Sequence, residues 1–265
     1  SVTPHIASRH LQTEDLSSTL TGLAAALPAR SDASDSETLY APAHLEPPVH
    51  DGDGVRYHDA MHVLDQAIPA GADIFVDAGN TGAAAVHYLG ARHNGRYVVA
   101  LGMGGMGYAF GAGIGCAFAR AGRTVVIAGD GAFFMHGMEI HTAIEHRLPV
   151  TFVIVNNNAH AMCVTREQLY YSGDYSFNRF APSHIASGLA AMFPGLVCHS
   201  ADTVADLEAA MHEAMTHSGP SVVEVVCSTD EIPPFAPFLS SEIAKEKTHD
   251  RHDHRNIQAR PESFA

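Results

Sequence analysis

The chain has 265 residues, and its content of 46% hydrophobic and 17% charged residues is typical of a globular protein with a buried core. The formal net charge of −14 argues against nucleic acid or an anionic membrane surface as a partner. The four scattered cysteines form no Cys-x-x-Cys pair, no apolar run is long enough to cross a membrane, and no signal peptide is recognised. We therefore expect a cytoplasmic protein in a reducing compartment.

Residues 1–30 predict one amphipathic helix, with Thr13 as its N-cap and two acidic residues in its first turn. Its apolar stripe consists of Leu16, Leu20, Leu23 and Leu27. A single helix cannot form a domain, so we expect the closing helix of another domain or a docking arm. Residues 31–54 are rich in Ser, Asp, Pro and Gly, a composition typical of a linker.

In residues 55–230, short apolar runs alternate with helical segments. This order predicts an α/β fold, a parallel β-sheet with helices on both faces. Strands are expected at residues 73–77, 98–101, 124–128, 150–155, 196–198 and 221–227, and helices at 57–68, 83–89, 108–121, 137–146, 185–192 and 204–217, the last capped by Thr203. Residues 231–265 predict an irregular tail, whose histidine-rich stretch 248–254 is either a metal-binding tract or a flexible polar segment.

Two polar signals follow neighbouring strands of the predicted sheet. Gly129-Asp130-Gly131 follows the run 124–128, and three asparagines, Asn156 to Asn158, follow the run 150–155. The carboxyl ends of neighbouring parallel strands meet at one edge, which places the Asp130 carboxylate beside a carboxamide. Such oxygens suit Mg²⁺, and the glycines allow a diphosphate to approach the backbone. The alternative is a strand-to-helix turn that Asp130 caps. A second Gly-Asp-Gly, at residues 52–54, follows no strand and predicts a polar turn.

This strand–helix–strand unit resembles the fingerprint of thiamin-diphosphate-dependent enzymes. Gly-Asp-Gly-Ala-Phe-Phe-Met at 129–135 and Arg-Leu-Pro-Val at 147–150 are similar to the acetolactate synthase branch. The resemblance implies the thiamin diphosphate-binding fold of the diphosphate-binding (PP) domain, with thiamin diphosphate and Mg²⁺ as cofactors. It implies Asp130, Asn157 and the backbone carbonyl of Ala159 as metal ligands, with Asn158 as the alternative to Asn157.

Further cofactor contacts follow from the same resemblance. In the glycine-rich stretch 101–108, Met106 matches the apolar residue that supports the bent cofactor, and the Gly104 carbonyl matches the acceptor for its amino group. Asn80 and Thr81 occupy the place where relatives bind the diphosphate from the opposite side. The remaining implied cofactor residues are Gly129, Gly131, Ala132 and Met162. The alternatives are a helix start that only packs closely and a plain turn.

Two residues are candidates for contact with the substrate. Arg166 stands where acetolactate synthases carry a tryptophan, and an arginine there could bind a carboxylate, phosphonate or sulfonate. It could equally be a surface arginine or pair with a partner chain. His160 is a candidate for proton transfer, with a structural histidine as the alternative. Glu139, at a glutamate position of the family, is expected to be structural.

The resemblance covers residues 55–230 and implies that the catalytic glutamate comes from a separate pyrimidine-binding domain. We expect either one subunit of an α₂β₂ heterotetramer or a fragment of a longer chain, with residues 1–30 as the remnant of a middle domain. The expected activity is decarboxylation of a 2-oxo acid followed by carboligation. The alternatives are plain decarboxylation, as in sulfopyruvate or phosphonopyruvate decarboxylase, and a non-catalytic cofactor-binding homologue.

Overall fold

The computed structural model describes residues 13–27 and 45–239 of a chain that divides into two units, 1–44 and 45–265. In the first unit, helix α1 spans Leu16–Ala26. Its N-cap is Asp15, whose side chain accepts a hydrogen bond from the N–H of Ser18, so the prediction of Thr13 was wrong. The Thr13 hydroxyl instead contacts the backbone of Asp15, before the helix begins. All four leucines of the predicted stripe are exposed.

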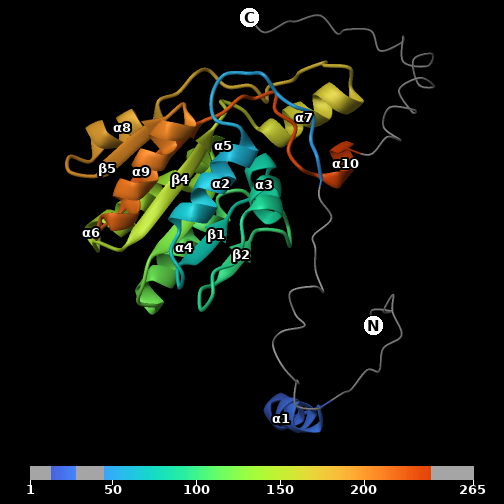
Figure 1. Cartoon of the computed structure of the whole chain (residues 1–265), viewed down its shortest axis with the longest axis vertical. Helices are drawn as coiled ribbons and strands as arrows, with labels where there is room; N and C mark the ends of the chain where they lie inside the picture. Colours follow the sequence, from blue (N-terminus) through green and yellow to red (C-terminus); the bar gives the residue numbers. More distant parts are fainter. Residues whose placement is uncertain (1–12, 28–44, 240–265) are drawn as a thin grey trace, which may run out of the picture. The chain divides into compact units, whose positions relative to one another are not determined.

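The second unit is built on a six-stranded sheet (Figure 1). The strands are β1 (Asp73–Val76), β2 (Tyr97–Val99), β3 (Thr124–Gly129), β4 (Val150–Asn156), β5 (Val197–Ala201) and β6 (Ser221–Val226). Every neighbouring pair is parallel, and the order across the sheet is β2-β1-β3-β4-β6-β5. The central strands β3 and β4 are buried on both faces, which is why they read as continuous apolar runs. The predicted α/β fold class is confirmed.

Helices cover both faces of the sheet. One apolar core joins α2 (Tyr57–Ala67), α3 (Asn80–Tyr88) and α9 (Val204–Thr216) to strand side chains such as Ile127 and Val153. A second core, on the opposite face, joins α4 (Tyr108–Ala119), α6 (Ile140–Glu145) and α8 (Ile185–Met192) to Val126 and Phe152. Successive strand residues thus serve opposite cores, as the alternation of side chains along a strand requires. The predicted N-cap Thr203 is confirmed, because its hydroxyl accepts the N–H of Asp206.

Two helices near the predicted site differ from those expected. Helix α5 (Asp130–His136) starts directly at the end of β3 and was not predicted. The helix predicted over 137–146 is present as the 3₁₀ turn Gly137–Glu139 followed by α6. At Gly137 the ring of Phe133 fills the space that a side chain would need. Helix α3 begins at Asn80 because Gly79, with φ of 97°, turns the chain immediately after β1.

The remaining described segments are short. Helix α7 (Ala161–Tyr170) follows the asparagines, and α10 (Ala236–Leu239) ends an otherwise irregular stretch after β6. Residues 45–56, which include the second Gly-Asp-Gly, form no helix or strand. The rest of the predicted linker and the histidine-rich stretch 248–254 lie outside the described residues. Within the described ranges, no helix has the length and apolar character needed to cross a bilayer.

Candidate cofactor site

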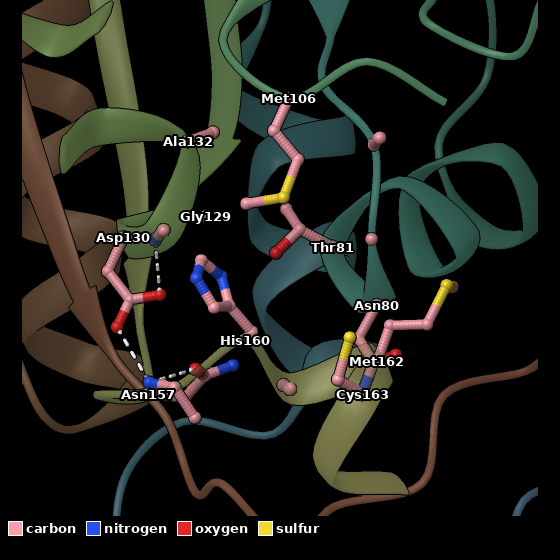
Figure 2. Close-up of a pocket in the computed structure, with 15 residues that line it drawn as sticks. Asn80, Thr81, Met106, Gly129, Asp130, Ala132, Asn157, His160, Met162 and Cys163 are labelled. Carbon is pink, nitrogen blue, oxygen red and sulfur yellow. Dashed lines mark hydrogen bonds between the residues drawn. The ribbon is translucent and has the colours of Figure 1, made fainter. Parts of the chain in front are cut away.

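The carboxyl ends of β3 and β4 bring a carboxylate and a carboxamide together. Gly129 at the end of β3 lies in register with Val155 of β4, so Asp130 and Asn157 both stand at the same edge of the sheet. The backbone N–H of Ala159 donates to the Asp130 Oδ2 at 3.0 Å and to the Asn157 Oδ1 at 3.1 Å. Figure 2 shows these two side chains converging on that amide. Two buried oxygens from neighbouring strands therefore point to one place.

The three asparagines have three different surroundings. Asn156 donates from its carboxamide to Glu224 at 2.6 Å, and Asn158, in the left-handed conformation at φ of 52°, accepts the N–H of Ser183 at 2.8 Å. Asn156 also donates to the Ser183 carbonyl at 3.0 Å, so both side chains point to the segment before α8. Of the three, Asn157 is the one that the fold brings to Asp130.

Asp130 is a buried acid, 1% exposed, that is not paired with a basic side chain of the described residues. Burial raises the pKa of Asp130 to about 6, although hydrogen bonds from the N–H groups of Gly131 and Ala159 act in the opposite direction. The described residues contain no group of three His, Cys, Asp or Glu side chains arranged to bind a metal. A cation here would therefore be bound by Asp130 together with neutral oxygens.

A pocket lies beside this pair and collects most of the predicted site residues (Figure 2). The predicted residues in its lining are Asn80, Thr81, Met106, Gly129, Asp130, Gly131, Ala132, Asn157, Ala159, His160 and Met162. The lining also contains four residues that were not predicted, Ala78, Gly79, Ala161 and Cys163. Their position next to predicted residues in the sequence was the only signal that could have indicated them.

Gly131 leaves space for two side chains that enter the pocket. A Cβ atom at this position would lie 2.6 Å from the His160 Nδ1 and 2.9 Å from the Met106 Cε. The His160 ring packs edge-on against Phe180 with 4.6 Å between centroids, and its Nδ1 is buried without a hydrogen-bond partner. The pocket therefore contains an apolar thioether and an imidazole nitrogen that has no partner in the described part of the chain.

At the opposite wall, α3 presents its first turn. Gly79 gives α3 no side-chain cap, so the backbone N–H groups of its first turn are free to bind an anion. The side chain of Asn80 differs from the expected diphosphate donor, because its Nδ2 donates to the Thr165 hydroxyl at 3.1 Å. That hydroxyl donates to the Ala161 carbonyl, so it can only accept from Asn80. The buried Asn80 Oδ1 has no partner among the residues that the structure describes. Asn80 thus offers the pocket an acceptor.

Two predicted residues lie outside the lining. Gly104, with φ of 63°, belongs to an exposed loop before α4, and Arg166 is exposed on α7. Their assigned roles stay predictions.

The fold and the site define an α/β cofactor-binding domain whose ligand edge is formed by the carboxyl ends of β1, β3 and β4. Residues 77–225, more than half of the chain, match the family described as thiamine pyrophosphate enzyme, C-terminal TPP binding domain. Thiamine pyrophosphate is thiamin diphosphate. The chain belongs to this family, and the predicted resemblance is confirmed.

Relatives agree with this assignment. A Mycobacterium tuberculosis protein that carries the name acetolactate synthase large subunit is 32% identical over 70% of this chain and 33% of its own length. A sulfoacetaldehyde acetyltransferase of Alcaligenes xylosoxydans xylosoxydans is 28% identical over 69% of this chain and 31% of its own length. The chain thus spans about a third of the length of these relatives.

The solved structures include a similar fold. Benzoylformate decarboxylase from Polynucleobacter necessarius matches 71% of this chain and 36% of its own, with a TM-score of 0.59 and 20% identity. At this identity the match concerns the fold alone.

Proposed function

We propose that this chain is the diphosphate-binding subunit of a thiamin-diphosphate-dependent 2-oxo acid carboligase of the acetolactate synthase type. The observation that carries the proposal is the convergence of the Asp130 and Asn157 oxygens on one backbone amide at the edge of the sheet. The similarity to proteins named as acetolactate synthases supports carboligation. We propose a cytoplasmic location, which is compatible with four free cysteines in the described residues.

The donor set of the site fits a hard divalent cation. Asp130, the Asn157 carboxamide and the Ala159 carbonyl would hold Mg²⁺ with three oxygens, and the diphosphate would complete its coordination. A cation at this position would stabilise the ionised form of Asp130, whose pKa is raised to about 6 by burial. The free N–H groups of the first turn of α3 would bind diphosphate oxygens. The unpartnered oxygen of Asn80 suits a donor group of the cofactor or the substrate.

When bound, thiamin diphosphate supplies the electron sink for decarboxylation. The chain would position the cofactor and transfer protons to or from the substrate. Met106 extends over Gly131 and would fill the irregular gap beneath the cofactor rings, for which a flexible thioether is suited. His160 has a buried Nδ1 at the same place, and this nitrogen would hold or release a proton at the substrate.

The pocket lacks one group that the proposed chemistry needs. Among the described residues that line it there is no glutamate, and Asp130 is the only carboxylate. We propose that the glutamate which activates the cofactor comes from a pyrimidine-binding partner subunit in an α₂β₂ heterotetramer. The substrate would then bind between the two subunits, and this chain alone would hold the cofactor weakly.

A second candidate function is plain, non-oxidative decarboxylation. Arg166 replaces the tryptophan that shapes the acceptor pocket in acetolactate synthases, and an arginine favours a substrate with a second acidic group. In that case the product is an aldehyde, whereas carboligation gives an acyloin.

The test is to express the full chain together with a candidate partner that carries a pyrimidine-binding domain, and to purify the complex. Consumption of 2-oxo acids is measured with and without thiamin diphosphate and Mg²⁺, and the products are identified by mass spectrometry. We expect cofactor-dependent consumption with acyloin as the product. Aldehyde alone would favour the second candidate, and cofactor binding without any consumption would contradict both.

A further inference from the structure

We propose that Tyr57 is a positioning residue that fixes the orientation of the Asn157 carboxamide, so that its oxygen faces the cation. The inference rests on the proposed function, because it concerns the proposed metal ligand. Tyr57 is the first residue of α2 and lies outside residues 77–225, which carry the family match. It also lies outside the lining of the pocket, so its role is exerted through Asn157.

Three polar groups of Asn157 have partners in the fold. Its Nδ2 donates to the Tyr57 hydroxyl at 3.0 Å, and its Oδ1 accepts the N–H of Ala159. Its backbone carbonyl accepts the hydroxyl of Thr229, from the segment after β6. Asn157 is therefore held by one residue that precedes the matched range 77–225 and by one that follows it.

Orientation matters because the two ends of a carboxamide are chemically opposite. The oxygen can bind a cation, whereas the amino group can only donate a hydrogen bond. If the carboxamide turned over, the amino group would take the place of the oxygen beside the Ala159 N–H, so two donors would face each other and one cation ligand would be lost. The Tyr57 hydroxyl opposes this by accepting from the amino group on the far side.

Tyr57 is itself held in place. Its side chain is almost completely buried in the apolar core formed by α2, α3 and α9. Its backbone N–H donates to both carboxylate oxygens of Glu231, at 3.0 and 3.1 Å, across 174 positions of sequence. The Tyr57 hydroxyl is therefore fixed by the packing of its ring and by a backbone contact.

The test is Tyr57→Phe in the full chain, which removes one oxygen atom and keeps the ring. Thiamin diphosphate binding is titrated by calorimetry over a series of Mg²⁺ concentrations. We expect the half-saturating Mg²⁺ concentration to rise about tenfold, because the Asn157 amino group becomes a buried donor without a partner. At saturating Mg²⁺ the cofactor affinity should approach that of the wild type, which a general loss of structure would not allow.

The matched control is Tyr97→Phe. The Tyr97 hydroxyl donates to the Ala85 carbonyl at 2.8 Å, and its ring packs against the same core without contact to Asn157. We expect this variant to lose a similar amount of thermal stability and to keep the wild-type Mg²⁺ dependence. A second variant, Glu231→Gln, keeps an acceptor for the Tyr57 N–H and should raise the half-saturating Mg²⁺ concentration roughly threefold.

The outcomes separate the two proposals. A wild-type Mg²⁺ dependence in Tyr57→Phe, or an equal shift in both tyrosine variants, overturns the positioning role and leaves the proposed function intact. A wild-type chain whose cofactor binding does not respond to Mg²⁺ overturns the metal site, and the positioning role with it.

Discussion

Two buried aspartates at opposite ends of the same sheet have opposite surroundings. Asp73 begins β1 at the amino edge and pairs with the Arg120 guanidinium at 2.8 Å, while the N–H of Arg96 donates to its other oxygen. Burial acts to raise the pKa of Asp73, but the hydrogen bonds from Arg120, Arg96 and Cys116 together hold it below its usual value. Asp130 follows β3 at the carboxyl edge with backbone amides as its partners, and burial raises its pKa to about 6.

The difference separates a structural charge from one that is left for a ligand. Asp73 is neutralised by a side chain of its own domain, so its ion pair and hydrogen bonds stabilise the fold. Asp130 destabilises the protein without ligand when it is ionised, which is a common property of binding sites. Position alone does not explain this contrast, since Asp77, also at the carboxyl edge, accepts the N–H groups of Gly107 and Ala109 at the start of α4. Asp77 therefore serves the fold.

The largest effects are expected when the charges of Asp73 and Asp130 are each removed by substitution with asparagine. Asp73→Asn should lower the free energy of unfolding by about 3 kcal/mol, because Arg120 loses its partner. Asp130→Asn should raise it by about 2 kcal/mol at pH 8 without metal, because an ionised buried carboxylate is removed. Urea denaturation in the presence of EDTA measures both. Changes of the same sign in the two variants would show that Asp130 is a structural charge like Asp73.

The position of Asp130 could be predicted from the sequence, whereas the pairing of Asp73 with Arg120 could not. The apolar runs at 124–128 and 150–155 predicted β3 and β4, and the polar residues that follow them predicted the edge where Asp130 and Asn157 meet. Helix α5 was not predicted, because Gly131 near its start and Gly137 at its end are poor helix formers. The contacts of Tyr57 with Asn157 and Glu231 join residues 100 and 174 positions apart, and no local pattern encodes such contacts.

A pH series would sharpen the same comparison. The folded pKa of Asp130 is raised, so its stabilising contribution is complete below its ordinary value of 3.8 and is lost as the pH rises through about 6. The lowered pKa of Asp73 acts in the opposite sense, and its contribution is lost on the acid side. Between pH 3.8 and pH 6, the free energy of unfolding of Asp130→Asn relative to that of the wild type should increase by roughly 2 kcal/mol. Glu231, raised to about 7, contributes equally to both proteins and cancels in the difference.

That series is measured by chemical denaturation in EDTA at successive pH values. A difference between the two proteins that does not change with pH would contradict the raised pKa of Asp130.

The smallest expected effects come from substitutions of two glycines, Gly131 in the lining of the pocket and Gly113 in the packed core. Gly131→Ala adds a methyl group against His160 and Met106, whose side chains can move, so stability should change little while cofactor affinity falls about tenfold. Gly113→Ala adds the same group where α4 packs against Val126 of β3, so it should cost about 1–2 kcal/mol and leave affinity unchanged. Calorimetric titration and urea denaturation of both variants measure these effects. Loss of affinity in Gly113→Ala with unchanged affinity in Gly131→Ala would place the ligand elsewhere.

The most direct test of the central claim is a calorimetric titration of thiamin diphosphate into the full chain, with Mg²⁺ and with EDTA, for the wild type and Asp130→Asn. We expect the wild type to bind with Mg²⁺ and to bind at least about a hundredfold more weakly in EDTA, and Asp130→Asn to bind weakly in both. Equal binding by the two proteins with Mg²⁺ would contradict the assignment of Asp130 as the residue that holds the cation and, through it, the cofactor.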